Sequence, residues 1–120
     1  MIGVIIGGIL GALTRYWFSK KALQIKGSAP YGTFFVNVVG SFLLGFIYVF
    51  LIEHEITSNF YNSIGVGFMG SFTTFSTFAV EGVTIFREQG AFRGILFSFF
   101  HTSICLVSCL LGICLAKILL

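Results

Sequence analysis

The sequence predicts an all-α integral membrane protein with four transmembrane helices. Of its 120 residues, 57% are hydrophobic and only 9% are charged, and the mean hydropathy is +1.02. Soluble domains typically carry about 25% charged residues. The hydrophobic residues form four long stretches, and a helix needs about 20 such residues to cross a bilayer. We therefore expect a single transmembrane domain covering residues 1–120.

The spans are predicted by the polar segments that separate them. The four expected helices are residues 2–18, 33–52, 60–86 and 92–120. The connections between them are residues 19–31, 53–59 and 87–91, of which only the first is long. The first stretch has no basic leader and no cleavage site before its polar loop, so we expect it to be retained.

The first span contains a positively charged residue, Arg15, that is a candidate for function. Gly7, Gly8 and Gly11 precede Arg15, which we place near the end of this span. An arginine at a pore mouth raises the local concentration of anions. The alternative is an arginine whose long side chain reaches out to the lipid headgroups, which is common near helix ends.

The second span contains one amide, Asn37, within an otherwise apolar segment. An amide at this depth can donate hydrogen bonds to a passing ion or can join neighbouring helices, and the sequence leaves both roles open. Gly40 and Gly45 are expected to allow close helix packing.

The third span carries an unusual run of hydroxyl and aromatic side chains, residues 70–78 (GSFTTFSTF). Hydroxyls are costly in hydrocarbon unless each finds a partner, and irregular polar backbone is tolerated there only inside protein or beside water. The span is also longer than a crossing requires. We therefore predict a helix broken near its centre, with Gly65, Gly67, Gly70 and Gly82 allowing the unwinding.

The polar run divides into two parts with different expected roles. Thr73 and Thr77 are expected to satisfy backbone groups freed by the break, and unwound carbonyls at membrane depth commonly hold a cation. Phe75 and Phe78 are three residues apart and share a helix face with the hydroxyls of Ser76 and Thr77 between them. Aromatic edges carry a positive quadrupole that can meet an anion, although such pairs also serve as packing. Glu81 is a candidate because acids within the membrane are often functional.

The fourth span has a weakly polar stripe at helical spacing. The stripe recurs at spacings of three and four and either lines a path or seats a neighbouring helix; its members are His101, Cys105, Ser108, Cys109 and Gly112. We expect Cys105 and Cys109 to be small packing residues, since free cysteine behaves as a small hydrophobe. Nothing resembles a catalytic triad, a phosphate loop or a metal-ligand cluster. We therefore expect neither enzymatic activity nor a nucleic-acid partner.

The charges of the connections are strongly biased. An even number of spans places both termini and residues 53–59 on one side, where Lys117 is the only lysine or arginine. The opposite side carries the other six, which are Arg15, Lys20, Lys21, Lys26, Arg87 and Arg93. The positive-inside rule then predicts that both termini lie outside the cytoplasm.

Three motifs occur in order, residues 7–16 (GGILGALTRY), 32–40 (GTFFVNVVG) and 67–78 (GFMGSFTTFSTF). Together they resemble the Fluc (CrcB) fluoride channel family over essentially the whole chain. The resemblance implies a passive fluoride channel in a bacterial plasma membrane, which lowers the fluoride concentration in the cytoplasm. It also implies four-helix subunits that pair antiparallel as a dual-topology dimer, with two fluoride pores and a central structural sodium ion.

The resemblance also assigns roles to particular residues. Asn37 would donate to fluoride, and the edges of Phe75 and Phe78 would contact it. The rest of the expected fluoride pathway comprises Ser76, Thr77, His101 and Ser108, with Arg15 at the vestibule. The backbone carbonyls of Gly70 and Thr73 would hold the sodium ion, and Glu81 matches the acid that follows the aromatic motif.

The chain departs from the family pattern in two ways. His101, Cys105 and Cys109 stand where relatives often carry tyrosine or asparagine followed by hydroxyl residues, and Ser108 or Thr102 would have to substitute. The six-to-one charge bias is also unexpected for a dual-topology protein. The partner is therefore either a second copy of this chain or an oppositely oriented paralogue.

Two alternatives remain open at this point. The first is a small proton-coupled four-helix multidrug exporter, which needs a titrating carboxylate in its substrate path and would have to use Glu81. The second is a structural membrane subunit that only packs against partners.

Overall fold

The computed structural model describes residues 1–26, 29–54 and 58–120 and contains helices and no strand over these ranges. The elements are α1 (Ile2–Lys26), α2 (Ala29–Glu53), α3 (Ser58–Tyr61), the π-helix η1 (Asn62–Met69), α4 (Gly70–Phe72), α5 (Phe75–Gln89) and α6 (Ala91–Leu119). Four segments are long and apolar enough to cross a membrane, and α3 to α5 together form the third. The predicted class and the number of spans are confirmed.

The first two helices are longer than predicted. The polar segment after residue 18 continues α1 to Lys26, and α2 already begins at Ala29. The expectation of a long polar connection is therefore wrong. Lysine, alanine, leucine and glutamine are good helix formers, so the segment remains helical after its hydrophobicity has ended. Pro30 lies in the first turn of α2, where its missing N–H is not needed.

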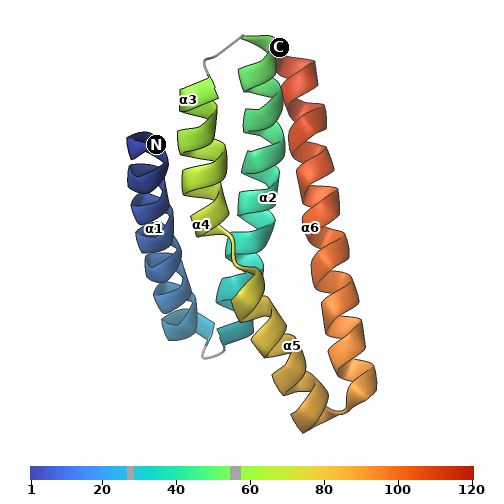
Figure 1. Ribbon diagram of the computed structural model, residues 1–120. Coiled ribbons are helices and arrows are strands. Elements are labelled where there is room, and N and C mark those ends of the chain that lie inside the picture. Colours follow the sequence, from blue (N-terminus) through green and yellow to red (C-terminus); the bar gives the residue numbers. More distant parts are fainter. Residues whose placement is uncertain (27–28, 55–57) are drawn as a thin grey trace.

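The helices form an elongated bundle with both chain termini at the same end (Figure 1). α1 joins α2, and α5 joins α6, at the opposite end (Figure 1). The second of these turns contains Gly90, whose φ of 99° lies in a region that favours glycine. Lys117 therefore lies at one end of the bundle, and Arg87 and Arg93 lie at the other. The comparison of charges on the two sides of the membrane assumed this placement.

The third span is broken at Thr73 and Thr74, both of which have extended backbone. Before the break, η1 and α4 pack on α1, whereas after it α5 packs on α6. The predicted break is confirmed, three to four residues after Gly70, which is itself helical. The break is therefore the point at which the third span changes its neighbour.

The glycines before the break allow close packing instead of unwinding. A Cβ at Gly7 would collide with the carbonyl of Ser63, one at Gly11 with the carbonyl of Phe68, and one at Gly67 with that of Val4. Because these contacts are with backbone, α1 and η1 approach each other as closely as helices can. Gly67 therefore allows this close approach, whereas a Cβ at Gly65 would meet only the Tyr61 ring at 3.5 Å; both glycines lie within η1, and the chain leaves the helix only at Thr73 and Thr74.

The second and fourth spans form the other closely packed pair. A Cβ at Gly45 would meet the carbonyl of Cys109, and a Cβ at Gly112 would meet that of Phe42. Ser108 joins the same pair of helices, since its hydroxyl donates to the Val38 carbonyl at 2.8 Å. These contacts hold α2 against α6. Asn37 lies on α2 and faces the break in the third span.

Candidate functional site

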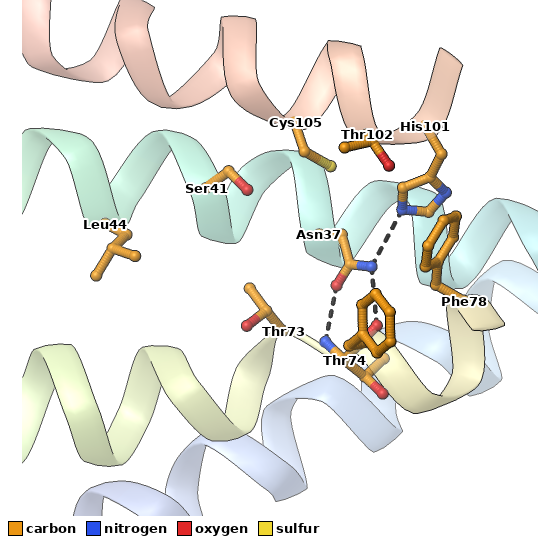
Figure 2. Close-up of a pocket in the computed structure, with 10 residues that line it drawn as sticks. Asn37, Ser41, Leu44, Thr73, Thr74, Phe78, His101, Thr102 and Cys105 are labelled. Carbon is orange, nitrogen blue, oxygen red and sulfur yellow. Dashed lines mark hydrogen bonds between the residues drawn. The ribbon is translucent and has the colours of Figure 1, made fainter. Parts of the chain in front are cut away.

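The site is built around the backbone of Thr74, which is buried and lies outside any helix. In a continuous helix the Thr74 N–H would donate to the Gly70 carbonyl four residues earlier. Here it donates to Asn37 Oδ1 at 2.8 Å, and Asn37 Nδ2 donates back to the Thr74 carbonyl at 3.0 Å. The amide of Asn37 thus replaces the helical acceptor that the Thr74 N–H lacks, and it adds a bond to the carbonyl of this N-cap residue (Figure 2). This pairing confirms that Asn37 links helices.

The threonine hydroxyls complete the break. Thr73 Oγ1 donates to the Met69 carbonyl at 3.0 Å, but this carbonyl also accepts from the Thr73 N–H at 3.1 Å and is therefore not a group freed by the break. Thr74 caps α5, because its Oγ1 accepts from the Thr77 N–H at 3.3 Å. The hydroxyls of Ser76 and Thr77 lie 3.2 and 3.1 Å from the same oxygen. From the sequence we expected Thr73 and Thr77 to bond the backbone groups freed by the break. In the structure the Thr74 hydroxyl does so, because it accepts from the Thr77 N–H.

A cavity of about 270 Å³ lies beside this pair, and we refer to it as the Asn37 cavity. Its walls come from α2, the break, α5 and α6 (Figure 2). It is lined by Asn37, Ser41, Leu44, Thr73, Thr74, Phe75, Phe78, His101, Thr102 and Cys105. The cavity therefore combines polar groups with two aromatic rings at membrane depth.

The two phenylalanines form one wall of the Asn37 cavity. Their ring centroids are 5.7 Å apart and the planes are inclined by 60°. Phe78 also contacts His101, at 4.4 Å between ring centroids, and stacks on Phe97. Phe75 is 79% exposed in this single chain, so it contributes little to the packing of the subunit itself. Its ring is therefore accessible to an ion or to another subunit.

His101 joins the Asn37 cavity to the fourth span. Its Nε2 lies 3.1 Å from Asn37 Nδ2, and its side chain is only 3% exposed (Figure 2). The ring is enclosed by Phe34, Phe78 and Phe97. His101 is therefore part of the wall and is bonded to the amide at its centre.

A second cavity, of about 500 Å³, lies on the other side of Thr74, and we refer to it as the Arg15 cavity. It is lined by Ala12, Arg15, Tyr16, Ser19, Lys20, Leu23, Thr33, Thr74, Thr77 and Glu81. Thr33 Oγ1 donates to Glu81 Oε1 at 2.6 Å, while Glu81 Oε2 has no hydrogen-bond partner among the described residues. Arg15 lies in the middle of α1, not at its end, because the helix continues to Lys26.

The expected pathway residues fall into three groups. Asn37, Phe75, Phe78 and His101 line the Asn37 cavity, together with Thr73. Thr77 and Arg15 line the Arg15 cavity. Ser76 and Ser108 line neither of the two, and the Ser108 hydroxyl is bonded between α2 and α6.

Sequence reasoning overlooked two hydroxyls on the face of Asn37. Thr33 is four residues before it and Ser41 is four residues after it, so all three share one face of α2. Thr33 holds Glu81, and Ser41 lines the Asn37 cavity. The four-residue spacing was the signal that could have identified them. Of the two cysteines, Cys109 packs against Gly45 as expected, whereas Cys105 lines the cavity.

The fold and the site define a multi-pass membrane protein whose broken third span separates two polar cavities. Residues 2–113 match the family described as "CrcB-like protein, Camphor Resistance (CrcB)". This chain belongs to that family.

Relatives named "Fluoride-specific ion channel FluC" are similar to this chain over most of its length. The protein from Shewanella oneidensis is 41% identical over 110 residues, which cover 91% of this chain and 89% of that protein. The one from Shewanella baltica is 40% identical over the same shares. The one from Methylococcus capsulatus is 36% identical over 119 residues, or 98% of this chain, but the chain spans only 52% of that longer protein.

Proposed function

We infer that this chain is a passive fluoride-selective ion channel that exports fluoride across the membrane and lowers its cytoplasmic concentration. The observation that carries this inference is the pair of cavities that meet at Thr74, each lined by polar side chains among apolar ones, within a chain whose relatives are named fluoride channels. The chain is accordingly a transport protein and not an enzyme. It is a multi-pass membrane protein, and in a bacterium it lies in the plasma membrane.

The chemistry of the Asn37 cavity suits a small anion. Fluoride holds its water tightly, so a pore must offer compensating hydrogen-bond donors while binding the ion weakly enough to release it. The amide of Asn37 carries donor hydrogens of this kind, which the structure directs at Thr74 and His101, and the edges of Phe75 and Phe78 add a weaker positive field. Thr77, beyond Thr74, supplies a hydroxyl on the side of the Arg15 cavity.

The Arg15 cavity supplies a positive entrance. Arg15 and Lys20 both line it, and clustered cations at a pore mouth raise the local anion concentration and the rate of entry. Glu81 is held by Thr33 in the same cavity. We propose that this cavity is the vestibule through which fluoride reaches Thr74.

The broken helix also fits a structural sodium ion. The N–H groups that would normally bond the carbonyls of Gly70 and Thr73 are those of Thr74 and Thr77, which donate to Asn37 and to Thr74 Oγ1 instead. A Cβ at Gly70 would meet nothing within 4 Å, so the space beside it is open. Carbonyl oxygens released in this way suit a hard cation. Gly70 and Thr73 would hold sodium, which would neutralise their partial negative charges.

A dimer is the proposed assembly, either of two copies of this chain or of this chain with an oppositely oriented paralogue. Phe75 is 79% exposed although it lines the Asn37 cavity, so one wall is open in a single subunit. A second subunit would close that wall. The charge bias favours the heterodimer, because each chain would then keep one orientation.

The multidrug-exporter alternative receives no support. The relatives reported above are named fluoride channels, and the family match covers nearly the whole chain. The carboxyl that such a mechanism would need, Glu81, lies in a cavity that also contains Arg15 and Lys20. Cations at this position would disfavour a cationic drug.

The test is fluoride efflux from liposomes that contain the purified protein. We expect fluoride to leave faster than from protein-free liposomes, and chloride to be retained. Efflux no faster than from protein-free liposomes, with chloride moving freely, would contradict the proposed function.

A further inference from the structure

The amide of Asn37 is fully used within the chain. A backbone N–H can only donate, so the bond from Thr74 N identifies the acceptor of Asn37 as Oδ1. Asn37 Nδ2 then carries both amide hydrogens. One is donated to the Thr74 carbonyl at 3.0 Å, and the other points to His101 Nε2 at 3.1 Å. A fluoride ion entering the Asn37 cavity would find no free hydrogen on this amide.

The same bond determines the protonation of the histidine ring. Asn37 Nδ2 is only a donor, so His101 Nε2 must be the acceptor and must carry no proton. The proton of the neutral ring is therefore on Nδ1. That nitrogen is buried and has no hydrogen-bond partner among the described residues. The contact thus requires one tautomer, with its lone pair directed at Asn37.

Protonation would reverse this contact. A proton added at Nε2 makes the ring an imidazolium with two donors and no acceptor, so it can no longer receive the Asn37 hydrogen. Asn37 Nδ2 would then have one free hydrogen, and His101 Nε2–H would point into the same space. The Asn37 cavity would then offer an anion two free N–H donors, one from Asn37 and one from His101, where the neutral ring leaves none. Both would lie beside the aromatic wall of Phe75 and Phe78.

We propose that His101 is a positioning residue that holds the Asn37 amide while its ring is neutral and releases that amide to fluoride when the ring is protonated. This proposal rests on the proposed fluoride channel function. Because binding linkage is reciprocal, fluoride in the Asn37 cavity also favours the protonated ring. The chain would conduct best in acid.

Few other titratable groups face His101 in the part of the chain that the structure describes. From α2 it is faced by Asn37 and Phe34, and from α5 by Phe78, none of which ionises in this range. On α5 the carboxyl nearest in sequence to Phe78 is that of Glu81, which accepts a hydrogen bond from Thr33. On α6 the Cys105 thiol lines the same cavity. Histidine is the side chain whose charge changes near neutral pH, so the response is assigned to His101.

The first experiment is the pH dependence of fluoride efflux from liposomes, with the rate of protein-free liposomes subtracted at each pH. The variant is His101→Gln, whose amide oxygen can accept from Asn37 but cannot take up a proton. The control is His54→Gln, which changes the other histidine of the chain, an exposed residue bonded to the Phe50 carbonyl. We expect efflux through the unmodified chain and His54→Gln to rise about tenfold between roughly pH 8 and 5, and efflux through His101→Gln to stay level.

The outcomes separate this proposal from the proposed function. Efflux that exceeds the protein-free rate but responds to pH equally in the unmodified chain and in His101→Gln would overturn the role of His101 alone. Efflux equal to the protein-free rate at every pH would overturn the channel function, and this proposal with it.

A second experiment does not depend on transport. In the His54→Gln variant, ¹⁵N-labelled histidine reports only His101 by nuclear magnetic resonance. We expect a neutral ring protonated at Nδ1 near pH 8, and a shift of its titration to higher pH when fluoride replaces chloride. A ring protonated at Nε2 near pH 8, or a titration that is the same in both salts, would overturn the proposal.

Discussion

At the scale of single residues, the account depends on how one amide is shared. Asn37 offers one acceptor and two donor hydrogens, and the structure uses all of them on Thr74 and His101. Linking helices and donating to an ion therefore compete for the same hydrogens. Phe75 has no such conflict, because it lines the Asn37 cavity and yet is 79% exposed.

Phe75→Ile should reduce fluoride efflux about tenfold, because the aromatic edge contact is lost. The fold should change little, since substitutions at exposed positions usually alter stability by less than about 0.5 kcal/mol. The matched control is Phe92→Ile, at a position that is 77% exposed. Equal efflux from the two variants in the liposome assay would show that Phe75 is not part of the pathway.

The residues that the sequence could identify are those whose chemistry is unusual in a membrane. Asn37, Phe75, Phe78 and His101 were predicted and do share one cavity. Ser76 and Ser108 were predicted with them, but hydroxyls also bond within and between helices, and Ser108 is bonded to Val38. Spacing alone cannot distinguish a hydroxyl that faces a path from one that joins two backbones.

At the scale of elements, the third span determines the site. It packs on α1 up to the break and on α6 beyond it, so Thr73 and Thr74 connect two different helix pairs. The sequence predicted the break from its polar run. It could not predict the π-helix at Asn62–Met69, because that geometry accompanies close packing against the glycines of α1. Likewise, the helical extension to Lys26 was missed because hydropathy reports a span and not the end of a helix.

The close packing of α2 on α6 leads to a prediction about stability. In Gly112→Val the added side chain would collide with the Phe42 carbonyl and force the helices apart, at a cost of about 1 to 3 kcal/mol. Cys114→Val adds bulk on the same helix at an exposed position and should be tolerated. Thermal unfolding in detergent measures the difference. Equal stability of the two variants would mean that this contact does not hold the helices together.

At the scale of the whole molecule, the uneven distribution of lysine and arginine and the exposure of Phe75 both indicate an assembly larger than one chain. The termini lie at one end of the bundle (Figure 1), and the ends of α1 and α5 that carry lysine and arginine lie at the other. Many large apolar side chains are exposed, as a lipid-facing surface requires, but Phe75 is exposed beside a polar cavity. The charge bias therefore predicts one orientation, and the exposed Phe75 predicts a second subunit.

Orientation can be measured by labelling. In a chain with its three cysteines changed to serine, Lys20→Cys and Lys117→Cys place one thiol at each end of the bundle. A maleimide that cannot cross membranes should label Lys117→Cys, and not Lys20→Cys, from outside intact cells, because the basic connections are expected in the cytoplasm. Labelling of about half of each variant would contradict a single orientation and favour a dual-topology homodimer.

Sodium should stabilise the assembly if Gly70 and Thr73 hold it. Anything that binds only the assembled state shifts the equilibrium towards that state. Replacing sodium by potassium at equal ionic strength should therefore lower the temperature at which the dimer is lost on size-exclusion chromatography, by several degrees. An identical temperature in the two salts would argue against the proposed site.

The most direct test of the central claim is the current through a planar bilayer that contains the purified protein. A passive fluoride channel should carry a steady current whose reversal potential follows the fluoride gradient and ignores an imposed chloride gradient. A proton gradient alone should not displace that potential. A reversal potential that follows chloride, or one that moves with the proton gradient as in a coupled exporter, would contradict the account.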